Sequence, residues 1–149
     1  MGFIETVVGV SIASVVLIGI LATFTMYVRN ALHLPERVQA NFLGEEGLEA
    51  LRVIRDADWT AFAALSETTR YLTFSTSTGW SSTETPQYID GMLRSFSVAS
   101  VSRDAEDDIV ETGGTDDPQT KRVDVTVAWQ ENGTTTLTLS TYFANIHAD

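Results

Sequence analysis

The chain has 149 residues, about one ordinary domain, and carries 20 Asp and Glu against nine Lys and Arg, for a formal net charge of -11. This balance argues against nucleic acid as the main partner, because binding to phosphates needs a basic face. Cys is absent and only two His are present, so the sequence offers no disulfide, no metal site built on thiolates and no Cys nucleophile. We expect a protein that is not an enzyme and that carries no cofactor and no metal.

A long apolar segment lies near the start of the sequence. Residues 6–28 contain no charged side chain and, at ~1.5 Å per helical residue, span roughly 35 Å. A helix that is apolar on all sides lies in lipid or in the core of a large assembly, and the remaining chain is too short to enclose it. A secretory signal peptide would have a basic region and a shorter apolar stretch. Close approach of a second helix is favoured by the small residues Gly9, Ser11, Ala13, Ser14, Gly19 and Ala22.

Glu5 lies at the start of this apolar segment. An unpaired ionisable residue in such a segment costs ~2.5–3.5 kcal/mol or more, so it indicates a functional role. The nearest cation in the sequence is the chain's own α-amino group, and the α-amino group of a neighbouring copy would serve equally well. The arrangement predicts a subunit that packs its N-terminal helix among identical helices.

Residues 1–12, Met-Gly-Phe-Ile-Glu-Thr-Val-Val-Gly-Val-Ser-Ile, resemble the mature N-terminus of type IV pilins and of type II secretion pseudopilins. In that family a membrane-embedded prepilin peptidase removes a short basic leader, the new first residue is N-methylated, and a Glu follows four residues later. Counting from Met1 places Glu5 at that position. The resemblance implies that Met1 is the processed and methylated residue, and that Met1, Phe3 and Glu5 serve assembly.

The charges that flank the apolar segment agree with a removed leader. No Lys or Arg precedes the segment, whereas Arg29 and Arg37 follow it. Read literally, the positive-inside rule would place the C-terminal part in the cytoplasm. A leader that carried Lys or Arg before its removal resolves this conflict.

The sequence departs from the family pattern in two places. The proline common within the family's helix would fall at Ala22, and the C-terminal Cys pair of many pilins is absent. Residues 45–56 and 121–129 also resemble pilin-like proteins of candidate bacterial phyla with small genomes.

A second helical stretch follows the apolar segment. Pro35 predicts a kink or break near residues 33–34, with helix resuming at Glu36. We expect this helix to end near residues 58–59, with Gly44 to Gly47 as a weak point. Apolar or small residues recur at helical spacing at Leu43, Gly47, Ala50 and Ile54.

The rest of the chain has the pattern of strands and turns. We expect a short strand at 71–74, a Ser/Thr-rich loop at 75–85, and a strand within 88–102 that has Phe96 and Val98 on one face. An acidic loop is expected over 103–120. Strict alternation then predicts two strands joined by a hairpin at 131–133. One apolar face is formed by Val123, Val125, Val127 and Trp129, and it continues with Leu137, Leu139, Thr141 and Phe143.

These elements predict an α+β fold in which a long N-terminal helix packs on a small antiparallel sheet, as in pilins. We expect two parts. Residues 1–34 form the hydrophobic N-terminal helix. Residues 35–149 form a globular head with helix to about residue 59 and loops and sheet over 71–145.

Several other residue groups suggest sites. The acidic loop offers carboxylates to Ca²⁺, but its spacing is not that of a calcium loop and we favour a solvated surface. Asn132 fits the N-glycosylation pattern, but the geometry of a hairpin turn already explains an Asn at this position. Residues 75–85 offer hydroxyls for O-linked sugars, but we favour an unmodified polar loop. Trp80 is the aromatic that we expect to be exposed. The loop carboxylates are Asp104, Glu106, Asp107, Asp108, Glu111, Asp116 and Asp117.

The expected function is that of a structural subunit of a type IV pilus-like extracellular filament, used for attachment, motility or DNA uptake. Its partners would be identical subunits, the cytoplasmic membrane before assembly, the pilus assembly machinery and prepilin peptidase. One alternative is a pseudopilin or minor pilin of a secretion or competence system. Another, from a different class, is a membrane-anchored extracellular binding domain.

Overall fold

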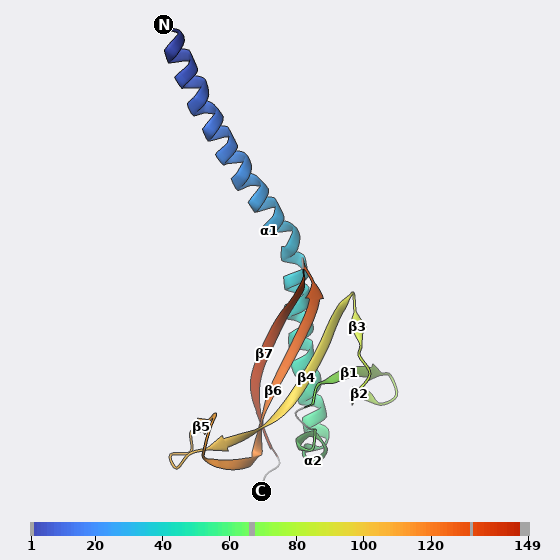
Figure 1. Ribbon diagram of the computed structural model, residues 1–149. Helices are drawn as coiled ribbons and strands as arrows, with labels where there is room; N and C mark the ends of the chain where they lie inside the picture. The colour runs from blue at the N-terminus through green and yellow to red at the C-terminus, as the bar shows by residue number, and fades with distance from the viewer. Residues whose placement is uncertain (1, 66–67, 132, 147–149) are drawn as a thin grey trace. The chain divides into compact units, whose positions relative to one another are not determined.

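The computed structural model describes residues 2–65, 68–131 and 133–146 (Figure 1). The chain divides into two compact units, Met1–Val38 and Gln39–Asp149. Helix α1 (Phe3–Ala57) contributes to both units, and the second unit also holds a seven-stranded antiparallel sheet. The long helix and the antiparallel sheet confirm the predicted α+β fold, and this architecture is compatible with that of pilins.

Helix α1 continues without interruption from Phe3 to Ala57, so a break at Pro35 is wrong, whereas a kink there stays a prediction. A proline in a helix interior lacks one N–H donor and costs about 3 kcal/mol, but it removes only one hydrogen bond of the ladder. The residue before proline is biased away from helical angles without being excluded from them. The helical hydrogen bonds on both sides of Pro35 are therefore sufficient to keep this position helical.

A second helix follows α1 directly. The predicted end near residues 58–59 is confirmed, since α1 stops at Ala57, but the short helix α2 (Trp59–Ala63) was not predicted. Asp58 is its N-cap, and the Asp58 carboxylate accepts a hydrogen bond of 3.0 Å from the Ala61 N–H. This cap satisfies one of the free N–H groups of the first turn and separates the two helices. Phe62 of α2 is fully buried.

All seven strands pair in an antiparallel manner, in the order β2-β1-β4-β6-β7, and β3 and β5 both pair with β4 (Figure 1). Their bounds are β1 (Arg70–Ser75), β2 (Gly79–Thr83), β3 (Tyr88–Ile89), β4 (Met92–Arg103), β5 (Ile109–Val110), β6 (Thr115–Gln130) and β7 (Thr134–Ala144).

Two predicted loops contain strands. The loop expected over 75–85 is wrong in part, because β2 pairs with β1 and brings Trp80 opposite Phe74. The ring centroids of these two residues are 5.2 Å apart in an edge-on arrangement, a cross-strand contact that outweighs the loop-like Ser/Thr composition. The acidic loop expected over 103–120 is likewise wrong in part, since it contains β5 and the first residues of β6.

The predicted alternation in β6 and β7 is confirmed. Val123, Val125, Val127 and Trp129 are all buried. Strand β6 pairs with β7 from Gln130 opposite Thr134, which confirms the hairpin, although Asn132 at its tip lies outside the described residues. The shared apolar face therefore forms one wall of the head's core.

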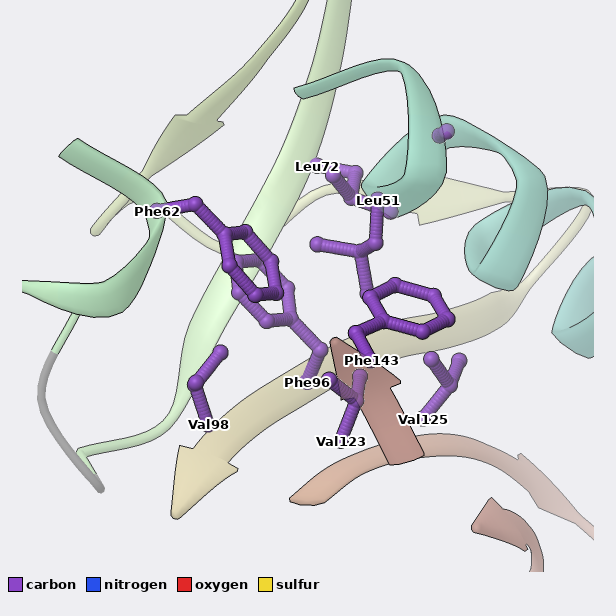
Figure 2. Packing of buried hydrophobic residues seen from close by; sticks show 9 residues of the cluster. Leu51, Phe62, Leu72, Phe96, Val98, Val123, Val125 and Phe143 are labelled. Atoms are coloured by element: carbon purple, nitrogen blue, oxygen red, sulfur yellow. The ribbon is translucent and has the colours of Figure 1, made fainter. Parts of the chain in front are cut away.

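Helix α1 covers this apolar face within the second unit. The predicted helical spacing is confirmed, since Leu43 and Ala50 are buried, as are Ala40 and Leu51. Figure 2 shows Leu51 of the helix among side chains that come from the sheet and from α2. This cluster consists of Ala50, Leu51, Phe62, Leu72, Phe96, Val98, Val123, Val125 and Phe143.

Two glycines allow the helix to lie close to the sheet. A Cβ atom at Gly47 would lie 2.9 Å from Val125 Cγ1, and one at Gly44 would lie 2.9 Å from Leu139 Cδ1. Both distances are shorter than carbon atoms tolerate. The glycines that weaken the helix in the sequence therefore allow its close contact with β6 and β7, and the contact is less adaptable at Gly47, which faces the short Val125 side chain, than at Gly44, which faces the end of Leu139.

Arg94 ties the helix to two strands. It lies on the core face of β4 with a side chain that is 2 % exposed, and it is the one charged residue that is buried in the described part of the chain. Its Nη1 donates to the Leu43 carbonyl at 3.3 Å and to Glu46 Oε2 at 3.0 Å, and its guanidinium lies 5.2 Å from the Trp80 ring centroid. Burial lowers the pKa of Arg94, an effect that the neighbouring Glu46 carboxylate partly offsets.

Replacing Arg94 by Ala is expected to lower the free energy of unfolding of the head by about 2 kcal/mol. The change removes the contact with Trp80 and the hydrogen bond to Leu43, whereas Glu46 is half exposed and regains water. Guanidinium unfolding of the full chain in nonionic detergent, followed by Trp fluorescence, measures the effect. Glu46→Gln serves as the control and should cost less, so an equal loss in both variants would contradict this account.

Candidate functional site

The candidate site is the surface of α1 over residues 3–28. Among the described residues, α1 is the one helix that is long and apolar enough to cross a membrane. An 18-residue stretch of it has a mean hydropathy of 2.5, and no residue of that stretch is buried within the chain. Its large side chains are open to the surroundings, with Phe3 85 % exposed and Ile4 78 % exposed. A continuous apolar surface of this size marks contact with lipid or with other protein chains.

Four hydroxyl side chains within this segment hydrogen-bond to their own helix. Ser11 Oγ donates to the Val7 carbonyl at 2.7 Å, and Ser14 Oγ donates to the Val10 carbonyl at 2.8 Å. Thr23 and Thr25 donate in the same way to the carbonyls four residues earlier. These bonds satisfy the hydroxyl protons without water, so the segment is chemically suited to lipid or to a dry core of packed helices.

Glu5 lies in the first turn of α1, where its backbone N–H donates to the Gly2 carbonyl at 3.0 Å. The residue is exposed, and its carboxylate has no partner among the residues that the structure describes. Met1 lies outside these residues. A carboxylate at a helix N-terminus gains about 0.3–1 kcal/mol from the helix dipole. This gain is smaller than the ~2.5–3.5 kcal/mol that an unpaired charge costs in lipid, so the helix dipole alone would not offset that cost.

The glycines of this segment are free of contacts within the chain. A Cβ atom at Gly9 or Gly19 would have no heavy atom within 4 Å. The missing side chain at Gly19 leaves a groove that is lined by Val16, Ile20 and Thr23, among others. Unlike Gly44 and Gly47 in the head, these glycines leave room for an external helix.

Two carboxylates of the acidic segment, those of Asp104 and Asp117, are used within the fold. Asp104 Oδ1 accepts hydrogen bonds from the backbone N–H groups of Glu106 and Asp108, and Asp117 Oδ2 accepts a bond of 2.7 Å from Arg103 Nε. In the described part of the chain no three His, Asp or Glu residues come together in an arrangement that would hold a metal ion. The local geometry of the segment is explained by these turn and ion-pair contacts.

Acid is expected to loosen this segment. The Arg103 hydrogen bond, with further bonds from Thr120 and Gln119, lowers the pKa of Asp117 to about 2. Because the folded-state pKa is below the unfolded value of about 3.9, the stabilisation is full above that value and is lost as the pH falls toward 2. The carboxyl ¹³C shift of Asp117 in a pH titration measures this pKa. A midpoint near 4 would contradict the pairing.

The other sequence-predicted sites have less support from the geometry. Trp80 was expected to be exposed, but it lies half-buried in β2 between Phe74 and Arg94. Asn132 lies outside the described residues, as does Met1. Within the Ser/Thr-rich stretch, β2 spans residues 79–83 and Ser75 hydrogen-bonds to Ser77, so part of it belongs to the sheet.

Comparisons with models of protein families, with curated proteins and with solved structures found no match. The structure itself adds residues that the sequence argument did not identify as important. Arg94 is the clearest example of such a residue. The sequence feature that could have identified it is a charged residue at a position where the alternation of β4 places a buried side chain. From the sequence, Ser11 is only a small residue of the apolar segment, and its hydroxyl bond to the Val7 carbonyl appears only in the structure.

Proposed function

We propose that this chain is a structural subunit of a type IV pilus-like extracellular filament. The observation that carries the proposal is a helical surface over residues 3–28 that is apolar on every side, exposed, and equipped with hydroxyls bonded to their own backbone. Before assembly this surface would contact the lipid of the cytoplasmic membrane. In the filament it would contact the helices of neighbouring copies.

The energetics of the exposed segment support a noncovalent polymer. Each buried large apolar side chain is worth about 1.5–3 kcal/mol relative to water, and most side chains of the segment are of this kind. Transfer of one subunit from a packed core to water would therefore be strongly unfavourable. The chain has no Cys, so its cohesion would rest on this burial.

Glu5 would set the axial position of each subunit in the filament. Its carboxylate would pair with the N-terminal amine of Met1 in a neighbouring copy, which neutralises both charges in a dry environment. By the resemblance of residues 1–12 to pilins, prepilin peptidase would remove a leader and Met1 would be methylated. Phe3 would contribute apolar contact beside this pair.

The proposal is tested by shearing material from the surface of cells that produce the chain and measuring how much of the chain it contains. We expect most of the chain in sedimentable surface material, with an intact mass that begins at Met1 and includes one added methyl group. Trace amounts would indicate a minor pilin or pseudopilin instead. Recovery only in the membrane would indicate an anchored binding domain, and a retained basic leader would contradict the assigned processing.

A further inference from the structure

A hollow lies on the face of the sheet that is turned away from α1. Its volume is about 360 Å³, at the lower end of the range of small-molecule sites. Its lining comes from β4, β5, β6 and β7 and from the residue after β5. The residues used below are Ser100, Ser102, Ile109, Glu111, Arg122 and Tyr142.

A bulge in β6 lies beside this hollow, opposite the lining residues Ser100 and Val101. Ser100 pairs with Lys121, but the next residue of β4, Val101, pairs with Asp117, so residues 118–120 of β6 have no partner on β4. The pairing of β6 with β7 continues through this region as far as Thr120. Bulges bend a strand and change the direction of its side chains, and they are frequent beside binding sites.

Arg103 ties together two segments beside the hollow, the bulge of β6 and the turn that leads to β5. Its Nε donates to Asp117 Oδ2 at 2.7 Å and its Nη2 donates to Thr120 Oγ1 at 3.4 Å, which fixes the bulge. Its Nη1 donates to the Asp107 carbonyl at 2.8 Å, which fixes the turn that leads to β5. A hollow beside segments that are tied together in this way needs little ordering when a ligand enters.

The lining combines an aromatic ring with both donors and acceptors. Tyr142 is 51 % exposed, which leaves ring surface open for contact with a ligand. Arg122 is oriented by Asp124, whose Oδ2 accepts from its Nε at 3.2 Å and from its Nη2 at 3.0 Å. Glu111 contributes a carboxylate acceptor, and the Ser102 hydroxyl can donate or accept.

We propose that this hollow binds a neutral saccharide, such as the terminal sugar of a glycan. A sugar ring has apolar C–H faces that pack on an aromatic side chain and hydroxyls that need both donors and acceptors, which is the combination found here. An anionic ligand is disfavoured, because the Arg122 guanidinium in the lining is already paired with Asp124, Glu111 also lines the hollow, and the chain carries a net charge of -11. The inference concerns the head alone and stands apart from the proposed polymerisation.

Saturation-transfer NMR on the full chain tests this inference. The chain is kept in a polyoxyethylene detergent, because a glycoside detergent would compete for the hollow. The probes are free neutral disaccharides built from glucose, galactose, mannose or N-acetylglucosamine, at millimolar concentrations, with a sialylated and a uronic-acid sugar as anionic comparisons. We expect transfer to at least one neutral probe and none to the anionic ones.

Variants then locate the site. Tyr142→Ala should weaken binding of the neutral probe by about tenfold or more, whereas Tyr88→Ala, at an exposed tyrosine of β3 outside the lining, should leave it unchanged. Chemical shifts of the unaltered chain give a readout independent of folding and should move at Ser102 and Tyr142 on addition of the sugar. The inference is overturned by an absence of binding to every neutral probe, by a preference for anionic sugars or peptides, or by shifts confined to other residues.

Discussion

Glu5→Ala is expected to leave the chain in the membrane and to abolish filaments. The apolar segment that follows Glu5 is unchanged in this variant, so insertion into lipid is preserved. Without the carboxylate, however, the N-terminal amine of a neighbouring subunit would be buried without a partner, at a cost of several kcal/mol per subunit. Membrane flotation measures the insertion, and electron microscopy of sheared surface material measures the filaments.

Two further variants make this result specific. Glu5→Gln keeps the size and hydrogen-bonding capacity of the side chain but removes its charge, and it should also fail to form filaments. Glu45→Ala removes an exposed carboxylate from the head portion of the same helix and should assemble normally. Normal filaments from Glu5→Ala would show that the acid is dispensable and would contradict its proposed pairing with the N-terminal amine of a neighbouring copy.

Gly47→Leu is expected to prevent the head from folding around α1. Even a Cβ atom at this position would lie 2.9 Å from Val125 and 3.1 Å from Arg94 Cδ, and the longer side chain would have to displace β6. Overpacking of this degree should lower the free energy of unfolding by about 3 kcal/mol or more. Guanidinium unfolding of the full chain in nonionic detergent, followed by Trp fluorescence, gives the measurement.

Gly44→Ala is the matched comparison. A Cβ atom there meets the Cδ1 end of Leu139, which is able to change rotamer, and Ala is favoured over Gly in a helix by about 1 kcal/mol. We therefore expect Gly44→Ala to be close to neutral. Equal and large losses in Gly44→Ala and Gly47→Leu would contradict the account, because they would indicate a general sensitivity of the helix.

Local patterns in the sequence were sufficient for much of the fold. The uncharged stretch over residues 6–28, the spacing of Leu43 and Ala50, and the alternation from Val123 to Trp129 each depend on residues close together in the chain. For the same reason Glu5 stood out as an acid beside an apolar segment. Its role as an assembly residue stays a prediction that rests on the resemblance to pilins.

The features that were missed depend on contacts between distant segments. Strand β2 exists because Trp80 pairs across to Phe74, and no pattern within residues 75–85 reveals that contact. The bulge in β6 appears only when its register with β4 is known, and the hollow beside Tyr142 is lined by residues of four different strands. The break predicted at Pro35 was wrong because the prediction considered only the local cost of a proline. The helical stretches on both sides are long enough for the helix to continue through it.

Electron microscopy of the purified chain after removal of detergent tests the central claim most directly. The account predicts filaments of uniform diameter in which the segment of residues 3–28 from many copies forms the core. Dispersed single particles would contradict it, if each is a monomer that inserts into added lipid vesicles without associating with other copies.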